Sequence, residues 1–176
     1  MNEKITAVLI TKHKDYPKII LDRLVGFDEI IIKTECPNIY TRYLEAAKAK
    51  NEIIYVQDDD CFVNHQELGL HYDGRLTNSM TPHHFQAYKD TGATLVGWGC
   101  FFPKEALKVF QKYIDKYGMD HHLYREADRI FTVLNQPHNT IIMPHEDLPQ
   151  TAERMSFEPN HYIWASEAIQ KTKLLT

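Results

Sequence analysis

The hydrophobic pattern of the first 60 residues alternates between short apolar runs and helical periodicity. Short apolar runs occupy residues 5–10, 30–32 (within a predicted strand over 28–33) and 53–56, which is typical of strands buried on both faces of a parallel sheet. Between them, apolar residues recur at helical spacing over 15–26 and 38–50. Strand, helix, strand, helix, strand in this order predicts a parallel sheet wound with right-handed crossovers.

The pattern is looser in the rest of the chain. Residues 61–80 show little periodicity and predict a long loop over a site. The remaining expected elements are a helix from Thr81 to about Gly92, a strand over 94–102, helices over 103–118 and 122–135, a strand over 140–143, and a terminal helix from Glu158. We therefore expect one α/β domain, with a central and mostly parallel sheet flanked by helices.

Composition narrows the class of protein. The 176 residues carry a net charge of −4, with no basic block or stripe, which argues against a nucleic-acid partner. Three cysteines without metal-type pairing, and no signal-peptide pattern, predict a reduced cytoplasmic protein. Apolar runs stay well short of the roughly 20 residues that cross a bilayer, so we expect no transmembrane segment.

An acidic tip ends the third predicted strand: Asp58, Asp59 and Asp60 directly follow the apolar run. Side chains alternate along an extended backbone, so Asp58 and Asp60 face one way. Hard oxygen ligands with open coordination positions suit Mg²⁺ or Mn²⁺, which also take up phosphate oxygens. A solvated acidic turn is the simpler alternative. The tip's place at the carboxyl edge of a parallel sheet, where ligands bind, favours a metal site.

These residues lead to a family resemblance. An Asp-x-Asp motif after an N-terminal nucleotide-binding half resembles the GT-A family of nucleotide-sugar glycosyltransferases. Three further segments are similar to parts of that family: Arg42-Tyr43-Leu44-Glu45-Ala46-Ala47 within the predicted helix 38–50, the glycine-bearing stretch 94–102, and Glu126-Ala127-Asp128-Arg129. Short viral transferases that act on capsid glycans look especially similar. The resemblance implies a single GT-A domain over 1–176, with a nucleotide-binding half (1–63) and an acceptor-side half (64–176).

By that resemblance, Asp60 would ligate Mn²⁺ or Mg²⁺ bridging the two phosphates of a nucleotide diphosphate. Asp58 would contact the ribose or help to hold the metal, and His145, after the last strand, is the third candidate ligand. The alternative for His145 is an ordinary surface histidine. A divalent ion at this place stabilises a departing diphosphate as a Lewis acid.

The nucleotide would lie at the ends of the first strands. Thr11 and Lys12 follow the first strand, where similar proteins hold the base and ribose. Arg42 offers a planar fork to a phosphate or stacks on the base, or else forms a helix-surface ion pair with Glu45. Asp59 is grouped with these residues, although alternation turns its side chain away from Asp58 and Asp60.

Gly97, Trp98 and Gly99 interrupt an apolar stretch and indicate a bulge or a close ligand approach. The flat face of Trp98 suits a sugar ring, whereas an aromatic side chain in an apolar strand is more often part of the core.

An inverting transferase needs a base to deprotonate its acceptor hydroxyl. The candidates are Asp128 and Glu126, which lie on opposite flanks of the apolar face of one predicted helix, so periodicity does not choose between them. We favour Asp128. Its structural alternative is a flank carboxylate paired with Arg125 or Arg129.

The leading hypothesis is a metal-dependent transfer of a hexose from a nucleotide diphosphate sugar, UDP-linked by preference, to a hydroxyl of a glycan or glycoprotein in the cytoplasm, or in the host cytoplasm for a viral protein. Two alternatives stay open. One is a nucleotidyl- or phosphotransferase that uses the same acidic tip, and the other is a non-catalytic module that binds a divalent ion or carbohydrate.

Overall fold

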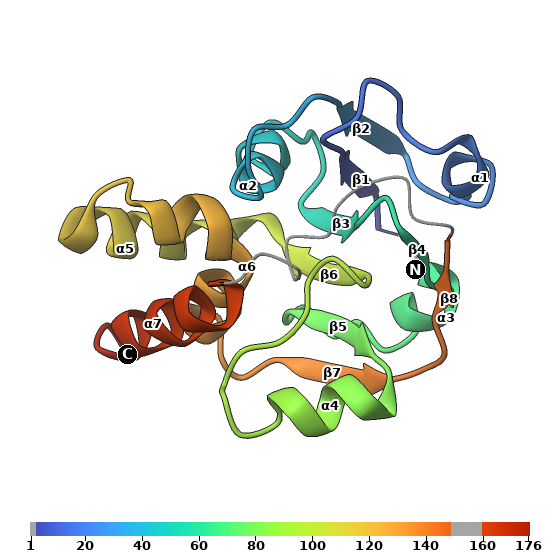
Figure 1. Ribbon diagram of the computed structural model, residues 1–176. Coiled ribbons are helices and arrows are strands. Elements are labelled where there is room, and N and C mark those ends of the chain that lie inside the picture. The colour runs from blue at the N-terminus through green and yellow to red at the C-terminus, as the bar shows by residue number, and fades with distance from the viewer. Residues whose placement is uncertain (1–2, 149–159) are drawn as a thin grey trace.

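A mixed six-stranded sheet forms the centre of the molecule (Figure 1). The computed structural model describes residues 3–148 and 160–176. The strand order is β2-β1-β3-β6-β5-β7, in which β6 alone runs antiparallel to its neighbours. The strands are β1 (Ile5–Ile10), β2 (Glu29–Lys33), β3 (Ile53–Gln57), β5 (Thr77–Met80), β6 (Cys100–Pro103) and β7 (Asn139–Ile142).

Helices cover both faces of this sheet. The helices are α1 (Lys18–Leu21), α2 (Thr41–Ala46), α3 (His65–Gly69), α4 (Pro82–Tyr88), α5 (Val109–Tyr117), α6 (His121–Leu134) and α7 (His161–Lys173), with a 3₁₀ turn, η1 (Lys104–Lys108), before α5. Figure 1 shows α2, α5, α6 and α7 on one face and α1 and α3 on the other. Within residues 3–148 and 160–176, no helix is both long enough and apolar enough to cross a membrane.

Two apolar cores lie between these layers. Tyr43, Phe102 and Phe131 belong to the core beneath α2, α5 and α6. Ile20 and Tyr55 belong to the core on the α1 and α3 face. Residues alternate across the sheet, so Ile54 and Val56 enter the first core while Ile53 and Tyr55 enter the second. The continuous apolar run of β3 therefore serves both faces.

The predicted fold class is confirmed, and several elements are corrected. The first strand, Ile5–Ile10, has the predicted bounds and is buried throughout. The second predicted strand is an edge strand, with Ile30 42% and Ile32 43% exposed, so its apolar run did not mean burial on both faces. The first two helices are shorter than predicted, because α1 and α2 span only 4 and 6 residues.

The middle of the chain differs most from prediction. The expected loop over 61–80 contains β4 (Cys61–Phe62), α3 and β5. The expected strand over 94–102 is largely a loop, since β6 begins only at Cys100. A small second sheet pairs β4 with β8 (Glu146–Asp147). Of the predicted terminal helix, Glu158 lies outside the described residues and α7 begins at His161.

Candidate carboxylate site at the end of β3

The acidic tip is a turn whose backbone is fixed on three sides. The N–H of Asp58 donates to the carbonyl of Gly97 at 2.6 Å, and the N–H of Leu148 donates to the carbonyl of Asp60 at 2.9 Å. The hydroxyl of Tyr16 donates to the carbonyl of Asp58 at 3.0 Å. All three aspartates are partly exposed at the carboxyl end of a buried strand. The turn thus holds its carboxylates at the sheet edge where parallel folds bind ligands.

A buried arginine lies under this turn. Arg42 of α2 is only 1% exposed. One guanidinium nitrogen donates to both carboxylate oxygens of Asp128 at 2.8 and 3.0 Å, and the other donates to Asp58. The hydroxyl of Tyr43 also donates to Asp128, at 2.6 Å. Arg42 therefore links the acidic turn to α6. The alternative of a helix-surface pair between Arg42 and Glu45 is wrong, since Glu45 pairs with Lys48.

Burial and neighbouring charges have opposite effects on the pKa values of Arg42 and Asp58. Burial alone would lower the pKa of Arg42, but the carboxylates of Asp128 and Asp58 raise it above its ordinary value. Burial raises the pKa of Asp58 to about 6; the positive charge of Arg42 opposes this rise, and Asp128, Asp60 and Asp59 add to it. The guanidinium stays charged in the core because two carboxylates converge on it.

Asp59 belongs to the other side of the turn. Its carboxylate accepts a hydrogen bond from the hydroxyl of Thr11 at the end of β1. Thr11 is buried, whereas Lys12 is exposed next to it. The predicted alternation therefore holds for Asp58 and Asp59: one carboxylate meets Arg42 and the other meets the adjacent strand end. Lys12 and Thr11 border the turn on the β1 side.

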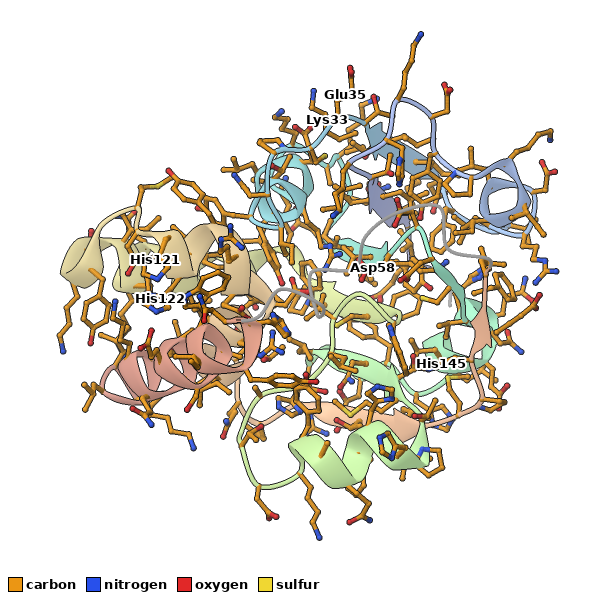
Figure 2. The ribbon with its side chains drawn as sticks, in the orientation of Figure 1. Lys33, Glu35, Asp58, His121, His122 and His145 are labelled. Carbon is orange, nitrogen blue, oxygen red and sulfur yellow. The ribbon has the colours of Figure 1, made fainter. Side chains whose placement is uncertain are left out.

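His145 lies further along the same region, directly before β8 (Figure 2). Its Nε2 atom is 3.0 Å from the hydroxyl oxygen of Ser79, and its ring packs edge-on against Trp98 at 4.5 Å between centroids. Asp58, Asp60 and His145 do not form a preassembled cluster of three ligands within the described part of the chain. The turn itself suits a hard cation, because carboxylate oxygens line it and the Oδ1 atom of Asp60 is buried.

Gly97 and Trp98 shape the opposite wall. A Cβ atom on Gly97 would collide with the carboxylate of Asp58, so the close approach inferred from this glycine is an approach of the acidic turn itself. Trp98 lies between two histidines, with its ring 4.0 Å from that of His84 and 4.5 Å from that of His145. Gly99 adopts a positive φ of 89° and leads the loop into β6.

The two predicted bases occupy different environments on α6. The side chain of Asp128 is 17% exposed, and its partner is Arg42 rather than Arg125 or Arg129. The side chain of Glu126 is fully buried, 2.6 Å from Arg129 and 3.4 Å from the Nδ1 atom of His161. Burial raises the pKa of Glu126 to about 7, against the charge of Arg129. Glu126 also has non-helical φ and ψ of −120° and 25°, which kink α6.

Sequence patterns missed three contributors to this site. These are Tyr16, Tyr43 and Ser79. No sequence motif marks Tyr16, the helical pattern predicts only an apolar-face position for Tyr43, and Ser79 falls in a predicted loop. A buried tyrosine hydroxyl usually finds a hydrogen-bond partner, which is the one general hint that Tyr16 and Tyr43 gave.

No family model matches the chain, and no curated protein matches it in sequence. Solved structures with a similar fold include the Aq1419 protein from Aquifex aeolicus VF5, with 15% identity, coverage of 81% of this chain and 88% of that chain, and a TM-score of 0.50. Another is glucosyl-3-phosphoglycerate synthase from Mycobacterium tuberculosis in complex with Mn²⁺, UDP and phosphoglyceric acid, with 10% identity, coverage of 98% and 78%, and a TM-score of 0.50. At these identities the likeness concerns the fold alone.

Proposed function

We propose that this chain is a metal-dependent glycosyltransferase that moves a hexose from a UDP-type donor to a hydroxyl acceptor. The observation that supports this most is the acidic turn at the carboxyl end of β3, fixed beside the end of β1 and linked by Arg42 to α6. The synthase of similar fold was crystallised with Mn²⁺ and UDP, which are the metal and nucleotide that the proposal requires.

In this proposal Asp60 is the primary ligand of Mn²⁺ or Mg²⁺, with Asp58 and His145 as further candidates. The bound ion would supply Lewis-acid stabilisation of the departing diphosphate. Asp58 already accepts a hydrogen bond from Arg42, which favours the ribose role over full metal coordination for this residue. The Nε2 atom of His145 is 3.0 Å from the hydroxyl oxygen of Ser79. His145 could therefore bind the ion only after this contact is broken by the incoming donor or ion.

The nucleotide would lie over the ends of β1 and β3. Thr11 and Asp59 are bonded to each other at this place, and the exposed Lys12 beside them provides a positive charge for a phosphate or a polar contact for the ribose. The Gly97-Trp98-Gly99 segment would border the donor sugar. Arg42 is too buried to stack on a base, so its proposed role is to hold Asp58 and Asp128 in place.

Asp128 is the proposed base, and exposure favours it over Glu126. A general base must come within hydrogen-bond reach of the hydroxyl proton, and 17% of the Asp128 side chain is exposed, against none of the Glu126 side chain. Arg42 and Tyr43 fix the orientation of its carboxylate. If the reaction retains configuration, the same carboxylate would orient substrate instead of taking a proton.

Several finer points belong to the proposal. They are the division into a nucleotide-binding half (1–63) and an acceptor-side half (64–176), an acceptor of the glycan or glycoprotein class, and a cytoplasmic location. The narrower resemblance to viral transferases acting on capsid glycans is a further hypothesis of the same kind, which only the identity of the acceptor can test.

Ligand-dependent thermal unfolding tests the binding part of the proposal. UDP with MnCl₂ should raise the unfolding temperature of the wild-type chain, since a ligand at a hundred times its Kd adds about 2.7 kcal/mol. Asp60→Ala should abolish the shift, and Asp115→Ala, an exposed carboxylate on α5, should keep it. No shift with any nucleoside diphosphate would contradict the proposal.

Donor hydrolysis separates the enzyme from the alternatives. Release of UDP from a UDP-sugar by the wild type, absent in Asp60→Ala, supports a transferase. Binding without turnover in the presence of a range of hydroxyl acceptors would favour a non-catalytic module. A thermal shift with ATP and metal, but none with UDP, would favour a nucleotidyl- or phosphotransferase.

A further inference from the structure

A second group of metal-type side chains lies at the interface between α6 and α7, separate from the acidic turn. His121 and His122 begin α6, and Glu167 lies in the middle of α7. One ligand atom from each of these three residues lies within 4.8 Å of the other two, and they form the one group of three or more such residues across 3–148 and 160–176. Figure 2 shows the two histidines together at this end of the molecule.

The central contact is already close to coordination geometry. The Nε2 atom of His122 is 3.0 Å from the Oε2 atom of Glu167. Two ligands bound to one tetrahedral Zn²⁺ at about 2.0–2.2 Å are separated by ~3.3 Å, so a small outward shift would admit the ion. The ring of the exposed His121 lies 3.8 Å from that of His122 between centroids.

The surroundings of His122 resemble the outer shell of a metal ligand. Its Nδ1 atom is 3.3 Å from the Oδ2 atom of Asp120, and metal-binding histidines commonly donate their other ring N–H to a carboxylate. With Nδ1 facing Asp120, the Nε2 atom, 3.0 Å from Glu167, is the nitrogen placed to coordinate an ion.

Charge at this interface also suits a divalent cation. Asp120 and Glu167 contribute two negative charges, and Lys171, 3.0 Å from Asp120 and 3.1 Å from the Nδ1 atom of His122, contributes one positive charge. Arg125 of α6 stacks on Trp164 of α7, with its guanidinium carbon 4.4 Å from the ring centroid.

We propose that His121, His122 and Glu167 bind a transition-metal ion of the Zn²⁺ class, which fastens α7 to the beginning of α6. Two imidazole nitrogens and one carboxylate oxygen suit Zn²⁺, Co²⁺ or Ni²⁺ better than Mg²⁺. The fastened helix carries His161, which contacts Glu126 on α6. The ion would therefore stabilise the helix pair beside Asp128 without touching the acidic turn.

Equilibrium dialysis of the full chain, stripped with EDTA, against ZnCl₂ tests this site. The wild type should bind Zn²⁺ at this site, and His121→Ala and Glu167→Gln should bind it at least about tenfold more weakly. Both substituted residues are exposed, so the variants should keep the wild-type circular dichroism spectrum. Affinities within twofold of wild type in both variants would overturn the proposal, as would a wild-type chain that binds no Zn²⁺.

Two control variants and one variant of the outer shell make the result specific. His83→Ala removes one member of another adjacent histidine pair at the start of a helix and should leave the Zn²⁺ affinity unchanged. Asp60→Ala removes a proposed ligand of the acidic turn and should leave the Zn²⁺ affinity of the α6–α7 site unchanged, which separates this site from the proposed transferase function. Asp120→Asn keeps a good helix cap but weakens acceptance from Nδ1, and should reduce Zn²⁺ affinity about 10–100-fold.

Discussion

Helix α6 takes part in two ion clusters that differ in how they meet solvent. In the first, Arg42 lies between Asp58 and Asp128, whose side chains are 38% and 17% exposed. In the second, Arg129 pairs with Glu126, whose side chain is fully buried, while His161 approaches from α7. One cluster has a buried cation with carboxylates that reach the surface, and the other has a buried carboxylate.

This difference in exposure distinguishes a cluster that can meet a ligand from a cluster that supports the fold. A carboxylate that is partly exposed and oriented by a buried arginine can meet a ligand without rebuilding the core. A carboxylate enclosed by Arg129 and His161 cannot, and its raised pKa shows the cost of that enclosure. We infer that the first cluster positions substrate-facing groups, and that the second joins α7 to α6. The variants below test this division.

The largest expected effect is that of Arg42→Ala. It leaves two carboxylates facing each other without their common cation, and breaking a buried ion pair by removing one partner typically costs about 3–5 kcal/mol. Chemical denaturation at neutral pH measures the loss. Lys48→Ala, which breaks the exposed pair with Glu45, is the matched control and should cost less than about 1 kcal/mol. Equal effects of the two variants would contradict the assigned role of Arg42.

Glu126→Gln should produce the next largest effect, and it depends on pH. The folded-state pKa of Glu126 is about 7, against an ordinary value of 4.5, so between these values the folded chain holds a proton that the unfolded chain has released. Stability therefore falls as pH rises through this window. The substitution removes this fall, which is on the order of 3 kcal/mol at about 1.4 kcal/mol per pKa unit.

The measurement for Glu126 is the free energy of unfolding of both chains from about pH 5 to about pH 8. The wild type should lose stability relative to Glu126→Gln as the pH increases. Glu67→Gln, at an exposed position on α3, should run parallel to the wild type. A wild type that gains stability over the variant with increasing pH would show that Arg129 outweighs burial.

Tyr43→Phe should have the smallest effect of the three. It removes the 2.6 Å hydrogen bond to Asp128 but keeps the ring contacts with Phe110 and Phe131. Loss of a hydrogen bond to a charged group costs about 2 kcal/mol, measured by thermal unfolding. Tyr162→Phe, at a position 77% exposed, should change stability very little. A loss as large as that of Arg42→Ala would mean that Tyr43, not Arg42, organises the cluster.

How far the sequence predicted the fold depended on the length and context of each element. The run at 5–10 became β1 with the predicted bounds, and its place between two strands with core on both faces agrees with its largely apolar sequence. The strand predicted over 28–33, with its run of three isoleucines, became the edge strand β2, since an apolar run does not say how many neighbours a strand has. Short elements such as β5, whose residues Thr77, Asn78 and Ser79 are polar and yet buried, carry no hydrophobic signal.

The candidate site was also predictable only in its local part. The acidic turn was predictable, because three carboxylates at the end of an apolar run are visible in the sequence, and so was their place at the sheet edge. The partner of Arg42 was not, because Asp128 is 86 residues away and helical periodicity favours local partners such as Glu45. Gly97 predicts a close approach by another group, but only the fold identifies that group as Asp58.

Calorimetric titration of UDP into the wild-type chain with MnCl₂ tests the central claim most directly. We predict binding that requires the metal, disappears when EDTA replaces MnCl₂, is lost in Asp60→Ala and persists in Asp115→Ala. UDP binding that is the same in Asp60→Ala as in the wild type, or that is unaffected by EDTA, would contradict the assignment of the acidic turn as a metal-diphosphate site.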